Sequence, residues 1–230
     1  MVTDRPGLAQ EPGVLGNERL TALAGAVILV LSVIEMITVA ALHSLMAAHI
    51  VVGTLLAGPV IVKLASTGWR FVRYYTHAPA YRRKGPPRLL PRVLAPVLVA
   101  STLGVIGSGI ALAITGPAPR ALIVIHVLSF LVWMVTLAIH LVAYLPRALR
   151  LIADDLSRRP TPPGVPGRNT RLSATFGGLA IGAVGAALLV PAIPAWTAWG
   201  AADGTKFLIV AAIAALIGAA LARFSRAKEG

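Results

Sequence analysis

Long apolar segments separated by short polar ones make up most of the chain. The approximate bounds of these six segments are 21–41, 44–66, 91–115, 119–147, 172–191 and 205–223. Each is close to the roughly 20 residues that an α-helix needs to cross the hydrocarbon core of a bilayer. A helix also satisfies all of its own backbone hydrogen bonds, as lipid requires. The pattern therefore predicts an all-α, polytopic membrane bundle with six transmembrane helices.

The segments divide the chain into four parts. Residues 1–20 are predicted to be a mobile cytoplasmic lead, and 21–147 a four-helix membrane core. The basic, Pro/Gly-rich residues 148–171 are predicted to be a cytoplasmic linker, and 172–230 to add two transmembrane helices with a basic tail.

Two small-residue motifs modify this picture. Gly58-Pro59 is expected to kink the second helix, because proline removes a backbone donor and clashes with the preceding turn. Gly178-x-x-x-Gly182 in the fifth helix is expected to allow close packing against a neighbouring helix.

Composition and charge support a membrane protein and predict its orientation. The residues are 57% hydrophobic and 13% charged, with a formal net charge of +13. Of the 21 Lys and Arg residues, 19 fall in the alternate polar segments 1–20, 63–92, 147–171 and 223–230. Since cytoplasmic segments are enriched in Lys and Arg, both termini are predicted to be cytoplasmic. The charge is then explained by topology and anionic membrane lipid, and no nucleic-acid partner is expected.

The fourth segment carries the most informative polar residues. His126 and His140 lie fourteen residues apart, which on a helix places both rings on nearly the same face, roughly 21 Å apart. Phe130 and Trp133 fall between them on that face. This stripe in lipid indicates a site for one or two haems. The two aromatic residues are interpreted either as packing on porphyrin or as ordinary core.

The chain contains no cysteine. That excludes disulfides, thiolate ligation of haem, Cys-ligated iron–sulfur clusters and covalent attachment of haem through C-x-x-C-H. A haem in this chain is therefore expected to be of b type, held by His or Met.

A second histidine matches His126 in depth. Counting from the outer ends of the second and fourth helices places His49 and His126 at the same level. Gly53, one turn from His49, is expected to let a porphyrin approach the backbone. The hypothesis is a haem iron ligated by His49 and His126. The alternative is that each histidine only hydrogen-bonds a neighbouring helix.

At the level of His140, the opposite helix offers Lys63 in place of a histidine. Lysine is a rare haem ligand, and Lys63 is expected to extend towards lipid phosphates instead. His77 reaches this level only if its loop folds back. We therefore expect one haem rather than two, with His140 contacting either a quinone or a haem propionate.

Three further residues have open alternatives. Glu35, the acid within the spans, either accepts protons from a quinol or is a neutral, hydrogen-bonded side chain. Arg120 either pairs with haem propionates or anchors the end of its helix. His43 is interpreted as an interfacial hydrogen-bonding residue, with exchange for His49 as ligand the lesser alternative.

Residues 21–147 resemble the four-helix b-type cytochrome membrane subunits, such as those of hydrogenases and formate dehydrogenases. The likeness rests on His49, on Tyr74-Tyr75, on Gly85-Pro86-Pro87 and on the segment Phe130 to His140 with His126 before it. It implies that His49 and His126 ligate one haem and that His140 ligates a second. The sequence departs from the two-haem pattern, because it lacks a fourth histidine in the spans. The likeness is weaker over 148–230.

The resemblance implies a multi-pass protein of the bacterial inner (plasma) membrane that carries electrons between quinone and a redox partner. The expected partner is a soluble or membrane-anchored oxidoreductase subunit, and the chain is expected to serve such an enzyme rather than to act alone. The alternative is a non-haem accessory or transporter-like protein that recruits a partner through its basic segments.

Overall fold

The computed structural model is built from α-helices and one short 3₁₀ helix, over residues 11–84, 89–157, 165–199 and 204–228 that it describes. The elements are α1 (Pro12–Ala40), α2 (Leu42–Leu55), α3 (Ala57–Tyr75), α4 (Pro79–Lys84), α5 (Leu89–Thr115), α6 (Arg120–Leu156), α7 (Arg168–Leu189), η1 (Val190–Ala192), α8 (Ile193–Trp199) and α9 (Thr205–Lys228). The all-α prediction is confirmed.

Five helical segments are long and apolar enough to cross a membrane. They are Pro12–Ala40, Leu42–Tyr75, Arg92–Thr115, Arg120–Leu156 and Arg168–Trp199. A sixth apolar stretch, Thr205–Leu221, is shorter. Large apolar side chains cover the outside of the bundle, including Val30, Ile37, Phe176, Leu188 and Leu216. By helix length and hydropathy the chain is a multi-pass membrane protein, because only lipid would leave so many of these side chains on the surface.

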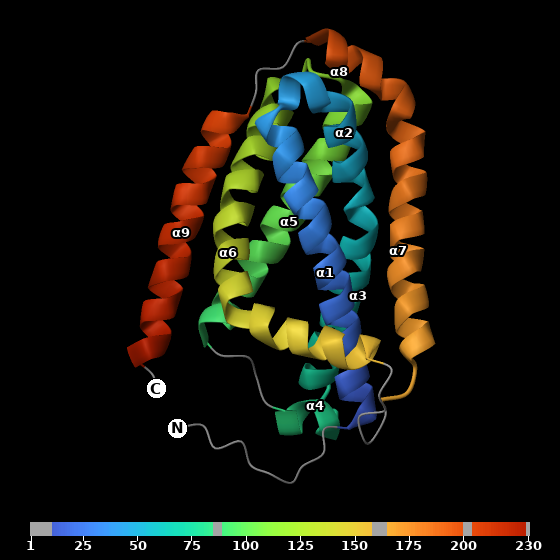
Figure 1. The fold of residues 1–230 in the computed structure, drawn as a ribbon, viewed down its shortest axis with the longest axis vertical. Coiled ribbons are helices and arrows are strands. Elements are labelled where there is room, and N and C mark those ends of the chain that lie inside the picture. The colour runs from blue at the N-terminus through green and yellow to red at the C-terminus, as the bar shows by residue number, and fades with distance from the viewer. Residues whose placement is uncertain (1–10, 85–88, 158–164, 200–203, 229–230) are drawn as a thin grey trace.

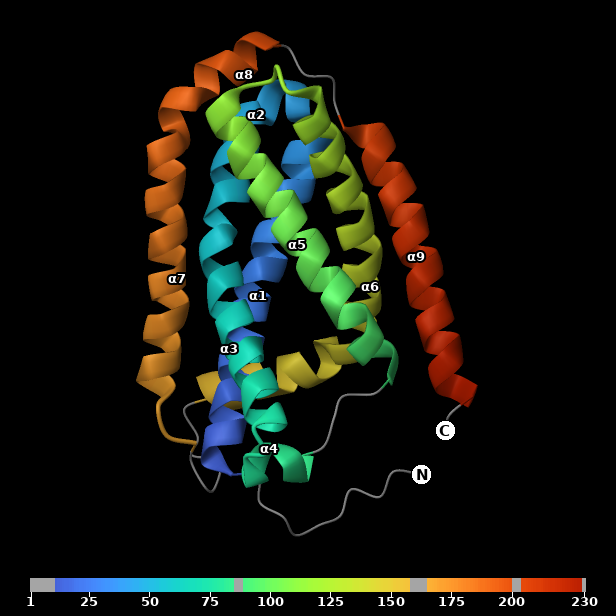
Figure 2. The same cartoon turned by 180° about the vertical axis from the view of Figure 1, so that it is seen from behind.

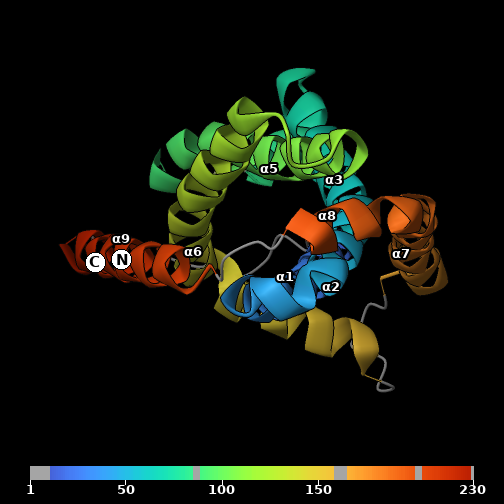
Figure 3. The ribbon, with the colours of Figure 1, turned by 90° about the horizontal axis from the view of Figure 1, so that it is seen from above.

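Four spans surround a common interior. These are α1, the pair α2 and α3, α5 and α6, and Figure 3 shows them arranged around the centre of the bundle. Figure 2 shows α5 crossing the face opposite α1. The helices α7 and α9 lie on opposite sides of this core, α7 against α2 and α3 and α9 against α6 (Figure 1). We call the two ends of the bundle the α8 end and the α4 end.

The second span breaks close to the predicted kink. The helix is interrupted at Leu56, between α2 and α3, and Pro59 is fully buried in the first turn of α3. Proline has no N–H, so the carbonyl of Leu55 loses the donor that would continue the helix. Pro59 is tolerated there, because N–H groups in a first turn have no intrahelical partner.

The predicted close packing of the fifth span is confirmed. A Cβ added to Gly178 would meet the side chain of Val62 and the backbone of Gly58, and one added to Gly182 would meet the backbone of Leu55. The glycines therefore bring the α7 backbone into direct contact with α2 and α3 around the break.

Two predicted boundaries are wrong. α1 begins at Pro12, so residues 12–20 are helical and not part of a mobile lead; Glu18 and Arg19 in this stretch are buried. α3 continues to Tyr75, beyond the predicted end near Ser66. In both cases the helix continues because ion pairs and hydrogen bonds at the α4 end satisfy its polar side chains.

The tail of α6 continues beyond the predicted end of the fourth span. After Pro146 the helix turns and passes across the α4 end of the bundle (Figure 1). Pro146 removes the hydrogen bond to the Val142 carbonyl, which accounts for the bend. The predicted lead over 1–10, the break at 85–87, the linker over 158–164 and the turn near Ala201 lie outside the described residues.

Candidate functional site

A cavity of about 2120 Å³ lies inside the four-span core. It runs from Trp196 near the α8 end to Arg150 near the α4 end. Small-molecule sites usually occupy about 300–1,000 Å³, so this space is large enough for a cofactor and a second ligand. The predicted site residues His49, His126, His140, Glu35 and Gly53 all line it.

The structure brings His49 of α2 and His126 of α6 together. Their ring centroids are 6.2 Å apart, and the ring planes are at 87° to one another. The prediction that these two residues share one level is confirmed. The hydrogen bonds of each ring then indicate which nitrogen carries the proton.

His126 is held from α5 by Ser108. The Ser108 hydroxyl donates to the Gly104 carbonyl at 2.5 Å and lies 3.1 Å from His126 Nδ1. A hydroxyl has one proton, so an oxygen that donates to a carbonyl accepts from the imidazole. His126 therefore carries its proton on Nδ1 and has a lone pair on Nε2.

His49 is held from α1 in the same way. Its Nδ1 lies 2.8 Å from Glu35 Oε1 and 3.2 Å from the Thr38 hydroxyl. The Thr38 hydroxyl donates to the Glu35 backbone carbonyl at 2.7 Å and lies 3.2 Å from Glu35 Oε2. An ionised Glu35 at this distance accepts the Nδ1 proton of a neutral His49, and that tautomer has its lone pair on Nε2.

The two rings fit the axial positions of one haem iron. An imidazole nitrogen binds a transition-metal ion at about 2.0–2.1 Å. Two rings on opposite sides of one metal ion therefore have centroids about 6.4 Å apart, close to the 6.2 Å between His49 and His126. The backbone of Val105 on α5 also hydrogen-bonds the His126 ring. No hydrogen bond to Nε2 of His49 occurs within the described part of the chain. The hydrogen-bonded Nδ1 atoms are the usual second layer of a metal-bound histidine.

A buried hydroxyl also faces the cavity without a partner. Ser32 lies one turn from Glu35 on α1 and is 4% exposed, and its Oγ has no hydrogen-bond partner among the described residues. Buried hydroxyls are normally hydrogen-bonded, so Ser32 is available to a bound molecule.

Two glycines make room for these side chains. A Cβ on Gly53 would lie 2.9 Å from Glu35 Oε1, and one on Gly109 would lie 3.0 Å from His126 Cε1. Gly53 lines the cavity, as expected, but the space that a Cβ there would take is occupied by the Glu35 carboxyl group beside His49.

Lys63 and His140 form a second level of the same cavity, nearer the α4 end. The two side chains interact electrostatically, and the His140 ring packs on Tyr144 with centroids 4.8 Å apart. Lys63 does not extend towards lipid phosphates as expected. Its Nζ donates to the Thr21 carbonyl at 3.4 Å and lies where a Cβ on Gly25 would be. The small residue on α1 admits the ammonium group into the interior.

The other candidates lie away from the cavity. Arg120 is exposed at the first residue of α6 and His43 is exposed on α2, and neither lines the cavity. His77, at a positive φ of 60°, follows the end of α3 and lies 3.2 Å from Arg82 through its Nδ1. These positions agree with Arg120 as a helix anchor and His43 as an interfacial residue.

Phe130 and Trp133 are core residues, as one of their two predicted interpretations has it. They line the cavity, and they also form a buried cluster with Ala211 of α9. Their ring centroids are 6.5 Å apart. The pair therefore fills the wall between the two histidine levels and anchors α9 to the core.

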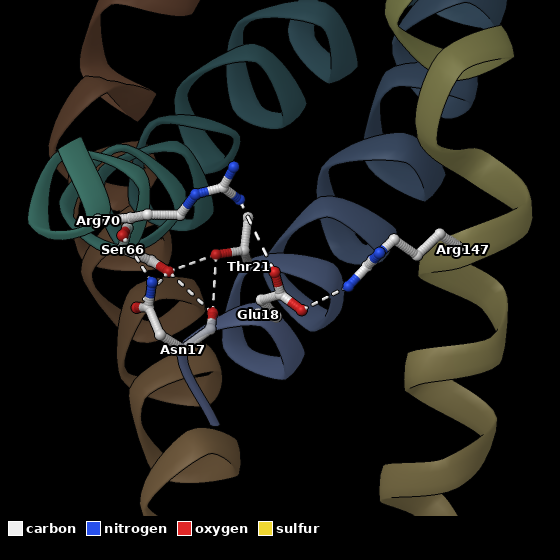
Figure 4. Close-up of polar contacts among 6 residues, drawn as sticks. All are labelled: Asn17, Glu18, Thr21, Ser66, Arg70 and Arg147. Atoms are coloured by element: carbon white, nitrogen blue, oxygen red, sulfur yellow. Dashed lines mark hydrogen bonds and ion pairs between the residues drawn. The ribbon is translucent and has the colours of Figure 1, made fainter. Parts of the chain in front are cut away.

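A polar cluster that the sequence analysis did not predict lines the cavity at the α4 end. Glu18 of α1 pairs with Arg147 of α6 at 2.8 Å and with Arg70 of α3 at 3.9 Å. Figure 4 shows these side chains converging from three helices beside a hydrogen-bonded group on α1 and α3. That group consists of Asn17, Thr21 and Ser66.

A second cluster beside it joins three elements. Asp155 in the tail of α6 is 3% exposed and accepts hydrogen bonds from Arg19 of α1 at 3.1 Å and from Arg171 of α7 at 3.0 Å through Nε. The bend at Pro146 is what brings Asp155 beside α1. Asp155 was not among the predicted site residues, because it lies beyond the end of the fourth predicted span at residue 147.

No group of three or more His, Asp or Glu side chains is placed to hold a bare metal ion in the described ranges. Two imidazoles suit haem instead, because the porphyrin supplies the other nitrogen ligands. Comparison of the chain with protein-family models, with curated proteins and with solved structures found no match.

Proposed function

We propose that this chain is a b-type cytochrome subunit that carries electrons between membrane quinone and a redox partner at the membrane surface. The observation that carries the proposal is the pair of imidazoles, 6.2 Å apart, with both Nδ1 atoms hydrogen-bonded. The separation of the two rings, close to that of two imidazoles bound to one iron, supports an axial ligand pair better than two unrelated core histidines.

In this proposal His49 and His126 are the axial ligands of one haem b. Glu35 and Ser108 keep the two rings in the ligating tautomer, and Gly109 admits the His126 ring. Haem supplies a centre that takes up and releases one electron. The apolar side chains of Met46, Ile50 and Leu112 would limit the access of water to a haem held there.

The level of Lys63 and His140 supports a quinone site. Both side chains can donate hydrogen bonds to a carbonyl oxygen, and the same continuous cavity connects them with the paired histidines. A flat ring with acceptor oxygens that dissolves in lipid suits this arrangement.

The proposed topology has six transmembrane helices with both termini cytoplasmic, in a bacterial inner membrane. Its support is that the first residues of α1 and α7, the helix α4 and the end of α9 lie at one end of the bundle (Figure 1). Most Lys and Arg residues belong to the polar segments at that end. Reporter fusions at Ala80 and Ala201 should report opposite sides of the membrane, and the same side for both would overturn the model.

The test of the haem proposal is a spectrum of the purified chain. A reduced-minus-oxidised α band of b type, with a pyridine haemochrome ratio near one haem per chain, is expected. A colourless preparation from haem-replete cells would contradict the proposal and favour the accessory-protein alternative.

A further inference from the structure

The two histidines of the pair differ in what holds them. His126 is held by a neutral hydroxyl, but His49 is held by the carboxyl of Glu35 at 2.8 Å. We propose that Glu35 is the positioning residue of His49 and that its negative charge lowers the midpoint potential of the bound haem. The inference rests on the proposed function and deepens it.

The geometry supports the positioning role. The Glu35 side chain is 10% exposed, and the Thr38 hydroxyl lies 3.2 Å from its second oxygen. Gly53 provides the space, since any Cβ there would meet Glu35 Oε1. The carboxylate is thus fixed by its surroundings, and it in turn fixes the Nδ1–H of His49. The His49 ring is thereby held 6.2 Å from that of His126, measured between ring centroids.

The chemistry supports the effect on potential. A carboxylate in the interior of a membrane protein is unfavourable unless a positive charge lies near it. Ferric haem with two neutral imidazole ligands carries one net positive charge at its centre, and ferrous haem carries none. Glu35 therefore stabilises the oxidised state more than the reduced state. Charge and hydrogen bonding near the ligands are recognised determinants of such potentials.

Glu35→Gln preserves the size of the side chain and an acceptor for Nδ1–H, but removes the charge. We expect haem to remain bound and its midpoint potential to rise by an amount equivalent to about a 10–100-fold change in relative affinity, or about 59–118 mV for one electron. The matched control is Ser108→Ala, which removes the neutral partner of His126 and should shift the potential by much less. An unchanged potential in Glu35→Gln, or an equal shift in Ser108→Ala, would overturn the charge effect.

A measurement without haem tests the positioning role separately. In the haem-free protein, ¹⁵N spectra should show His49 protonated on Nδ1, and Glu35→Ala should shift it to a mixture of tautomers while leaving His126 unchanged. The same tautomer in Glu35→Ala would overturn the positioning role. If the wild-type chain bound no haem, the proposed function would fail, while these spectra would still decide whether Glu35 orients His49.

Discussion

The cavity has two levels that differ in how their polar groups are satisfied. At the His49 level each imidazole has a partner on Nδ1, either Glu35 or Ser108, and a free acceptor on Nε2. At the Lys63 level the ammonium donates one long hydrogen bond, of 3.4 Å, to a neutral carbonyl. The first level offers lone pairs to a metal and the second offers protons to an acceptor. Two residues that face each other at one depth are therefore not always a pair of metal ligands: His49 and His126 are suited to that role, whereas Lys63 and His140 are not.

The largest expected effect follows from removing a ligand at the His49 level. His49→Ala or His126→Ala should each abolish the same b-type signal, because one lost ligand opens a coordination position of the iron. The spectrum and haem content of the purified variants measure this loss. The matched control is His43→Ala, on the same helix but exposed, which should keep most of the signal. Loss of the signal in His43→Ala with retention in His49→Ala would reverse the assignment.

The second effect concerns the α4 end, where buried ion pairs join α1, α6 and α7. Asp155→Ala leaves Arg19 and Arg171 buried without their acceptor, and should reduce the free energy of unfolding by about 3–5 kcal/mol. Thermal unfolding in detergent measures the change. Asp154→Ala, one residue earlier and exposed, is the control and should change stability by less than about 0.5 kcal/mol. Equal changes in the two variants would mean that the network contributes little.

The contrast between the levels also shows what the sequence can predict. The spans 91–115 and 119–147 and the common depth of His49 and His126 follow from segment length and helical rise. The sequence does not predict that Ser108 contacts His126 or that Thr38 contacts His49. A helix with lipid on one side and an apolar core on the other is apolar on both faces, so its sequence does not indicate which face is inside.

The charged clusters were missed for a different reason. Arg19 and Asp155 are 136 residues apart, and they meet only because α6 bends at Pro146 and passes beside α1. Glu18 was assigned to the polar lead, because the sequence does not show whether a carboxylate is buried or exposed. Its burial depends on Arg70 and Arg147, which lie far away along the chain.

A third effect is expected at the Lys63 level. Lys63→Met removes an ammonium that has no carboxylate partner within the described residues, and should raise the free energy of unfolding by roughly 1–3 kcal/mol. Haem content should stay the same, since Lys63 is remote from the paired rings. Lys206→Met, at an exposed position on α9, is the control and should have almost no effect. A loss of stability or of haem in Lys63→Met would mean that Lys63 holds a ligand of its own.

The smallest effect on haem is expected from His140→Ala, which decides between one haem and two. His140 lies on the same helix as His126, but the residue that faces it is Lys63, whose ammonium has no lone pair to give while it is protonated. We therefore expect haem content to remain near one per chain in His140→Ala, while reduction by quinol slows, because a donor to the quinone carbonyl is lost. Haem determination together with the rate of reduction by a quinol separates these readouts. A ratio near two in the wild type, falling to one in both His140→Ala and Lys63→Ala, would show that the lysine ligates a second iron and that electrons can pass across the whole membrane.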